Sequence, residues 1–180
     1  MHADGGAAAR RRGLAGRVRR LLGRAAGRPD HLPEGEPVTT PLTLQLKRRV
    51  PADRSRVWRA WTDPAELARW YWPDSFDTQC SIDLRVGGRF RIASEPAGMA
   101  VSGEFATVEP PARLVHTWRW DGEDDETLVT VEFLDAPDGA TDVVVTHERF
   151  TDPADSANHA QGWNDCLARL IAHDFSAPDR

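Results

Sequence analysis

The amino-acid sequence predicts an α+β fold: a curved antiparallel sheet of six or seven strands, two short helices, and one long C-terminal helix that the sheet grips. Residues 41–150 fall mostly into short alternating segments separated by glycine and proline turns, which is typical of antiparallel strands. The stretch from Asp152 to Phe175 instead carries apolar side chains at helical spacing: Trp163, Leu167, Leu170 and Ile171. A helix with one apolar stripe must bury it, so we expect it to cover the sheet.

The first elements of the domain are one strand and two short helices. Residues 42–50 alternate apolar and polar side chains, which predicts a half-buried strand. Asp53 opens a short helix that runs through Trp61, and Asp63, followed by proline, opens a second one that reaches Tyr71. Two short helices in succession cannot cross over to a parallel strand, so we expect them to fill one end of the sheet.

The remaining strands are joined by tight turns. Gly87-Gly88 predicts a hairpin, and Pro137-Asp138-Gly139 predicts a turn between the last two strands. The predicted strands are Cys80–Val86, Arg89–Glu95, Met99–Val108, Arg113–Trp120, Thr127–Leu134 and Thr141–Arg149.

The long helix has clear end signals and one irregular position. Asp152 is a good N-cap, and Pro153 suits the first helical position because its missing N–H would have no partner there. Pro178 marks the stop. Gly162, in the middle, costs about 1 kcal/mol relative to alanine. Close approach of the helix to the sheet, room for a ligand, or a plain bend would each explain it.

Composition and charge narrow the class of protein. The chain has 180 residues and a net charge of −5, with eight arginines and four acids in residues 1–40, and an excess of nine acids in the rest. An acidic body does not suit nucleic acid. No apolar run approaches the roughly 20 residues of a membrane span. Two cysteines make no disulfide framework, so we expect free thiols and a cytoplasmic protein, although a bridge is conceivable. Seven tryptophans are too many for a simple core.

Residues 1–40 are predicted to be an extension and linker, and residues 41–176 the folded domain. A basic amphipathic helix can form within residues 7–26, and residues 10–28 could make a weak contact with a membrane or an acidic partner. A disordered arginine-rich tail, or a start placed too far upstream, is the alternative.

Three groups of motifs resemble a known family. The first is the string from Val57 to Pro64, with Trp70-Tyr71-Trp72-Pro73 after it. The second is Gly87-Gly88-Arg89-Phe90, with residues 108–118. The third is the run from Thr146 to Phe150, with His159, Gly162-Trp163 and Leu167. Together they resemble the activator of heat-shock-protein-90 ATPase homologue-like family, within the START-like (SRPBCC), helix-grip superfamily that includes birch-pollen-allergen-like proteins. The resemblance covers residues 42–175 and implies a deep, largely apolar cavity between helix and sheet.

If the domain has this cavity, aromatic and histidine side chains on the concave face would contact a ligand. Aromatic rings give apolar contact at low entropy cost, and indole and imidazole nitrogens supply polar groups. The predicted ligand-binding residues are Trp70, Trp72, Phe90, Phe105, His116, Trp118, Trp120, His147, His159, Trp163 and Leu167. The alternative for each of them is that it only fills the core.

The sequence predicts no metal site, cofactor or catalytic residue. His116, His147 and His159 are not at a spacing that forces them to converge on a metal. No phosphate loop, dinucleotide fingerprint or nucleophile elbow is present, and Gly87-Gly88 precedes a strand rather than a helix.

Three functions follow as hypotheses. The first is binding of a small hydrophobic or amphipathic ligand, by a monomer or homodimer and without catalysis. The second is a cyclase- or dehydratase-like enzyme of the same fold, with His116 or His147 as the proton shuttle. The third, suggested only by the family name, is a co-chaperone-like interaction module.

Overall fold

The computed structural model describes residues 42–176. The predictions for residues 1–40, including the basic helix and the contact through residues 10–28, lie outside the described residues, as does the stop signal at Pro178. Of the domain predicted at 41–176, all but Pro41 is described, and it has the expected α+β architecture.

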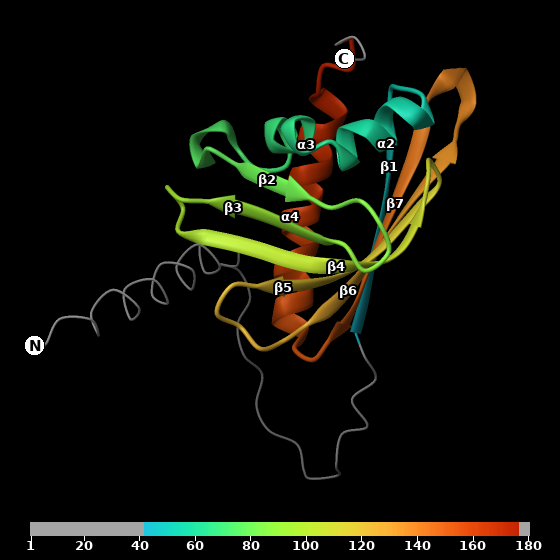
Figure 1. Ribbon diagram of the computed structural model, residues 1–180. Coiled ribbons are helices and arrows are strands. Elements are labelled where there is room, and N and C mark those ends of the chain that lie inside the picture. The colour runs from blue at the N-terminus through green and yellow to red at the C-terminus, as the bar shows by residue number, and fades with distance from the viewer. Residues whose placement is uncertain (1–41, 177–180) are drawn as a thin grey trace, which may run out of the picture.

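The sheet has seven antiparallel strands in the order β1-β7-β6-β5-β4-β3-β2, and it curves around the long helix α4 (Figure 1). Only β1 leaves the sequential order, because it pairs with the last strand β7. The strands are β1 (Leu42–Val50), β2 (Gln79–Ile82), β3 (Arg89–Ser94), β4 (Met99–Glu109), β5 (Arg113–Trp120), β6 (Thr127–Asp135) and β7 (Thr141–Phe150).

Two short helices, α2 (Arg54–Thr62) and α3 (Pro64–Trp70), fill one end of the sheet as predicted (Figure 1). Asp63 joins them: it ends α2 and caps α3, where its carboxylate accepts hydrogen bonds from the backbone N–H groups of Ala65 at 2.9 Å and Glu66 at 3.0 Å. One side chain thus satisfies two of the free N–H groups that begin a helix. Short 3₁₀ turns follow at Asp74–Phe76 and Pro137–Gly139.

Helix α4 (Pro153–Ala172) begins at the predicted residue. The Asp152 carboxylate accepts a hydrogen bond from the Ala154 N–H at 2.8 Å, and Pro153 occupies the first turn. The helix ends three residues before Phe175, where His173 adopts an extended backbone. The predicted stripe faces the sheet, and Trp163, Leu167 and Leu170 are all buried.

The turn between β2 and β3 is longer than the tight hairpin that Gly87-Gly88 predicts. Strand β2 ends at Ile82 rather than Val86, because the chain from Asp83 to Gly88 folds into a wider turn. Within it, the Gly88 N–H donates to the Arg85 carbonyl, and a Cβ on Gly88 would lie 2.0 Å from the Asp83 carbonyl oxygen. The sequence pair marks the turn correctly but not its length.

Gly162 is not explained by close approach of α4 to the sheet. A Cβ built there meets no atom within 4 Å, whereas one built on Gly103 in β4 would lie 1.9 Å from the Thr117 carbonyl oxygen. We therefore expect Gly162→Ala to raise the free energy of unfolding by about 1 kcal/mol, through helix propensity alone.

Gly103→Ala should lower the free energy of unfolding by about 1–3 kcal/mol, because β4 and β5 must separate to make room for the new Cβ. Urea denaturation measures both, and a loss of stability in Gly162→Ala would contradict the first.

Candidate functional site

Aromatic side chains fill the space between α4, the α2–α3 pair and the sheet. Trp163 of α4 contacts Trp118 of β5, with ring centroids 5.5 Å apart, and stacks on Trp61 of α2 at 6.2 Å. Tyr71, just after α3, meets the same Trp163 ring edge-on at 6.2 Å. All four side chains are at most 6% exposed. This interior aromatic cluster accounts for three of the seven tryptophans.

The cluster leaves a void of only about 30 Å³. A cavity must be larger, on the order of 150 Å³, to hold a benzene molecule, so the void has room for about one water. The prediction of a deep, largely apolar cavity, which the family resemblance implied, is therefore wrong for this structure, because indole and phenol rings fill the space. The lining residues are Trp61, Thr62, Leu67, Tyr71, Ile82, Phe90, Ile92, Phe105, Leu114, His116, Trp118 and Trp163.

Trp118 has a buried N–H with no acceptor within the part of the chain that the structure describes. Three other indoles do have partners: Trp70 donates to the Ala60 carbonyl at 2.9 Å, Trp120 to His159 Nε2 at 3.1 Å and Trp163 to His147 Nδ1 at 3.1 Å. A buried donor without a partner costs about 1–3 kcal/mol. The Trp118 ring lines the void, so this site has an unmet need for an acceptor.

His147 is held in one neutral tautomer by a chain of hydrogen bonds. Its Nδ1 accepts from Trp163, so the proton is on Nε2, which donates to Thr127 Oγ1 at 2.7 Å. The Thr127 hydroxyl then donates to the Trp118 carbonyl at 3.1 Å. Desolvation, with smaller contributions from His159 and His116, lowers the His147 pKa from 6.5 to about 2. Both nitrogens are engaged, so His147 is a poor candidate for a proton shuttle.

His116 lines the void and is hydrogen-bonded at one ring nitrogen. Its Nδ1 lies 3.0 Å from the Thr117 carbonyl oxygen, so that nitrogen carries the proton and Nε2 keeps the lone pair. Burial lowers the His116 pKa from 6.5 to about 4. The ring is therefore neutral at pH 7 and can accept a hydrogen bond, but it is too weak a base to store a proton there.

The predicted site residues divide into three groups. Those lining the void are Phe90, Phe105, His116, Trp118 and Trp163. A second cavity, of about 80 Å³, includes Trp118 again with Trp120 and His159. The residues lining neither are Trp70, Trp72, His147 and Leu167. Trp72 instead stacks on Trp120 with an interplanar angle of 7°, and Trp70 and Leu167 are core residues that are nearly fully buried.

Sequence reasoning missed several lining residues. Alternation places Leu114 on the same strand face as His116 and Trp118, although it was not among the predicted ligand-binding residues, and Ile92 shares its parity with Phe90, so alternation could have found it too. Trp61 and Tyr71 belong to the α2–α3 region, where helical spacing shows that a residue is buried but not which interior space it faces.

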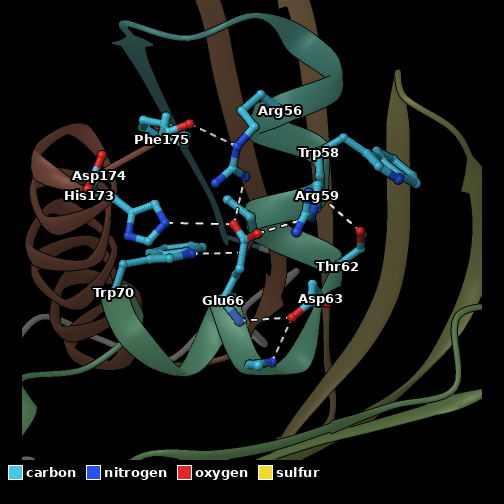
Figure 2. A network of polar contacts seen from close by, with 12 residues as sticks. Arg56, Trp58, Arg59, Thr62, Asp63, Glu66, Trp70, His173, Asp174 and Phe175 are labelled. Atoms are coloured by element: carbon cyan, nitrogen blue, oxygen red, sulfur yellow. Dashed lines mark hydrogen bonds and ion pairs between the residues drawn. The ribbon is translucent and has the colours of Figure 1, made fainter. Parts of the chain in front are cut away.

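A second buried cluster is ionic and ties α2 and α3 to residues 173–175, which follow α4 (Figure 2). Glu66 of α3, only 8% exposed, bonds Arg56 Nη1 at 2.6 Å and Arg59 Nε at 3.0 Å, both from α2. Arg56 also donates to the Phe175 carbonyl at 3.0 Å, and His173 Nε2 lies 3.8 Å from the Glu66 carboxylate. The cluster lies among helix ends and lines neither of these two cavities.

Other classes of site are limited by what residues 42–176 contain. Within them, no group of three or more histidine, cysteine or acidic side chains could hold a metal ion. Cys80 and Cys166 are free thiols, and burial raises the pKa of each to about 12. None of the described helices is long and apolar enough to cross a membrane.

Comparison with solved structures shows that the domain has a known fold. A protein from Chromobacterium violaceum is 28% identical, with a TM-score of 0.61 over 72% of this chain and 94% of its own. DynU16, a protein of the dynemicin biosynthetic locus, is 25% identical with a TM-score of 0.63, over 72% of this chain and 46% of its own. An HSP90 activator from Plasmodium falciparum is 22% identical, with a TM-score of 0.61 over 72% of this chain and 94% of its own, which shows the fold alone.

A search of the curated proteins found no match. A family model, however, matches residues 51–173, which span the domain from the start of the α2 region to the end of α4. Its description is "Activator of Hsp90 ATPase homolog 1-like protein". The curved sheet, the two short helices and the gripped C-terminal helix agree with that match and with the predicted resemblance, and the chain belongs to this family.

Proposed function

We propose that the protein binds a small, mostly apolar molecule that carries one hydrogen-bond acceptor. The site is the interior void, with the acceptor directed at Trp118 Nε1. The observation that carries this proposal is that Trp118, whose ring lines a mostly apolar space, has a buried N–H without a partner among the described residues. Binding of an apolar ligand is favoured by about 25 cal/mol for each Å² of apolar surface removed from water. A ligand acceptor would also remove the cost of leaving the Trp118 N–H without a hydrogen bond.

Binding requires the wall to move, because the void holds only about 30 Å³. The wall that faces the sheet comes from α2, α3 and α4, which contribute Trp61, Leu67, Tyr71 and Trp163. Helices pack on the sheet through side chains and are not part of its hydrogen-bonded ladder. They can therefore shift outward without breaking strand pairing, which makes them the elements that we expect to open.

A ligand hydroxyl would suit the site as well as a carbonyl. Its oxygen can accept from Trp118 Nε1, and its hydrogen can be donated to Nε2 of His116, which also lines the void. A small-molecule ligand also agrees with the place of one relative, DynU16, in the dynemicin biosynthetic locus.

The test compares acetophenone with α-methylstyrene, which replaces the carbonyl by a methylene group of similar shape. We expect the full-length protein to bind acetophenone about 2- to 10-fold more tightly, as one net hydrogen bond of about 0.5–1.5 kcal/mol provides. Trp118→Phe keeps an aromatic ring and removes the N–H, so it should abolish this preference. Titration by NMR or calorimetry gives both affinities.

Trp58→Phe is the matched control. It makes the same chemical change in a buried tryptophan that lines neither cavity and packs edge-on against Phe133. The preference for acetophenone should persist in this variant. No binding of either compound by the parent, or an unchanged preference in Trp118→Phe, would refute the proposal.

The two alternative functions receive less support. A cyclase- or dehydratase-like reaction needs a base that titrates near neutrality, whereas the pKa values of His116 and His147 lie at about 4 and about 2. The co-chaperone hypothesis rests on the family name, and the HSP90 activator from Plasmodium falciparum, at 22% identity, adds only a likeness of fold.

A further inference from the structure

Two separate contacts hold the α2–α3 pair to α4 and to the residues that follow it. The first, the Arg169 contact, is at the end of α3. Arg169 of α4 donates from Nε to the Trp70 carbonyl at 3.1 Å and from Nη2 to the Tyr71 carbonyl at 2.8 Å. Cys166 Sγ donates to the same Tyr71 carbonyl at 3.0 Å. Side chains of α4 thus bond the last carbonyls of α3, which the helix itself leaves without partners.

The second, the 173–175 contact, is made by the three residues after α4, which lie against α2 and α3 (Figure 2). Arg56 Nε donates to the Phe175 carbonyl at 3.0 Å, and the guanidinium lies over the Phe175 ring at 5.5 Å. The His173 ring meets the Phe175 ring edge-on at 5.1 Å. His173 Nε2 lies 3.8 Å from the Glu66 carboxylate, which is too long for a hydrogen bond.

The 173–175 contact contains polar atoms that lack partners. Four buried side-chain nitrogen or oxygen atoms have no hydrogen bond within residues 42–176, and two of them, Arg56 Nη2 and His173 Nε2, lie here. Their side chains are 12% and 8% exposed. Arg56 Nη2 is a donor, and His173 Nε2 is a donor in one tautomer and an acceptor in the other, so both are unsatisfied in either case. Contact with water would remove this cost.

The Arg169 contact differs in this respect. No nitrogen of Arg169 is among the buried atoms that lack a partner in the described part of the chain. Both contacts hold together in the folded protein, but only the 173–175 contact has groups that gain hydrogen bonds when water enters. Separation of the α2–α3 pair from α4 is therefore less costly at residues 173–175 than at Arg169.

Both contacts join the elements that form the helical wall of the interior void. Trp61 and Tyr71 belong to the α2–α3 region and Trp163 belongs to α4, and all three line the void. Trp163 contacts the rings of both Trp61 and Tyr71, at 6.2 Å in each case. The void therefore enlarges when the α2–α3 pair moves away from α4.

We propose that residues 173–175 are a releasable contact that controls access to the interior void. When they leave α2 and α3, the α2–α3 pair turns about the end of α3 that Arg169 holds, and a ligand can enter. This inference rests on the proposed function and adds the element that regulates it. The contact is present in the free and in the ligand-bound protein, so it governs the rates of entry and exit rather than the affinity.

Hydrogen exchange of the ligand-free, full-length protein tests the contact itself. Phe175→Ala removes the ring that packs against Arg56 and His173 but keeps the backbone carbonyl. Backbone amides of α2 and α3 should then exchange about 5- to 10-fold faster, because they exchange through this local opening.

Met99→Ala is the matched control for a general loss of stability. Met99 is partly buried against the same core, lies in β4, and lines neither cavity. This variant should accelerate the slowest amides of the sheet, which exchange by global unfolding, but change those of α2 and α3 by less than about 2-fold.

His173→Phe should act in the opposite direction from Phe175→Ala. It keeps an aromatic ring beside Phe175 and removes the buried nitrogen that has no partner. The closed arrangement then gains stability relative to the open one, so exchange of the α2 and α3 amides should slow by about 2- to 5-fold.

Binding kinetics test the link to the void. Line-shape analysis of NMR titrations with acetophenone gives the association and dissociation rate constants. Phe175→Ala should raise both by about 5- to 10-fold and His173→Phe should lower both by about 2- to 5-fold, with Kd within about 2-fold of the parent value.

The inference and the proposed function can fail separately. Unchanged exchange of the α2 and α3 amides in Phe175→Ala, or equal acceleration in Met99→Ala, would overturn the inference. So would parental rate constants in Phe175→Ala when acetophenone is still preferred over α-methylstyrene, a result that leaves the interior site intact. If acetophenone does not bind the parent, the proposed function fails and control of access fails with it, whatever the exchange rates are.

Discussion

Replacing Glu66 with alanine is expected to lower the free energy of unfolding by about 3–5 kcal/mol. The Glu66 carboxylate neutralises Arg56 and Arg59 from a position that is 8% exposed, and Arg56 is itself only 12% exposed. Removing the Glu66 carboxylate leaves the buried positive charge of Arg56 without its acidic partner. The Nη2 atom of Arg56 already lacks a hydrogen-bond acceptor among the described residues. Glu66→Gln should cost less, because the amide keeps an oxygen acceptor of the same shape.

The matched control is Asp121→Ala, which breaks an ion pair on the surface. Asp121 bonds Arg91 at 2.6 and 2.8 Å, which is comparable geometry, but both side chains are nearly half exposed. Exposed pairs of this kind contribute about 0–1 kcal/mol. Urea denaturation followed by tryptophan fluorescence gives both values. Similar losses in Glu66→Ala and Asp121→Ala would show that burial of the ionic cluster contributes nothing.

Stability should fall steeply with acid because two buried histidines remain neutral in the folded state. Their folded pKa values, about 4 for His116 and about 2 for His147, lie below the ordinary 6.5 mainly because burial disfavours the charged ring. The unfolded chain takes up both protons near pH 6.5, and the folded protein does not. Stability is therefore greatest above pH 6.5 and is lost as pH falls, by about 3 kcal/mol between pH 6.5 and pH 5.

His116→Asn isolates one of the two protons. The asparagine amide can still donate to the Thr117 carbonyl, as Nδ1 of the histidine does. The average slope of unfolding free energy against pH in this window should fall by about 1.1 kcal/mol per pH unit, because the unfolded histidine binds on average about 0.8 proton there. Urea denaturation at pH 5.0, 5.5, 6.0 and 6.5 measures the slope. An unchanged slope in the variant would mean that His116 is protonated when folded.

The architecture could be predicted from the sequence because its signals are local. Alternation marks the strands, Asp152-Pro153 marks the start of α4, and the stripe from Trp163 to Leu170 marks its buried face. Each of these depends on residues within a few positions of one another. The wide turn that shortens β2 was missed because its length depends on backbone hydrogen bonds that Gly87-Gly88 does not specify.

The interior could not be predicted in the same way. Spacing shows that Trp61, Trp118 and Trp163 point inward, but whether their rings line a cavity or fill it depends on how three separate elements pack. The ionic cluster could not be predicted from the sequence either. Arg56 and Glu66 occupy helical positions that are typical of solvent-facing charges, and His173 lies more than a hundred residues after Glu66 in the sequence. The resemblance to the family predicted the fold correctly, but it predicted a larger cavity than the structure has.

The central claim is that a bound ligand provides the hydrogen-bond acceptor that the Trp118 N–H lacks. The most direct measurement is the NMR spectrum of the indole N–H groups during titration with acetophenone and, separately, α-methylstyrene. The Trp118 signal should move downfield with acetophenone only, while the signal of Trp70, already bonded to the Ala60 carbonyl, stays in place. A Trp118 signal that ignores acetophenone, or that responds equally to both compounds, would contradict the account.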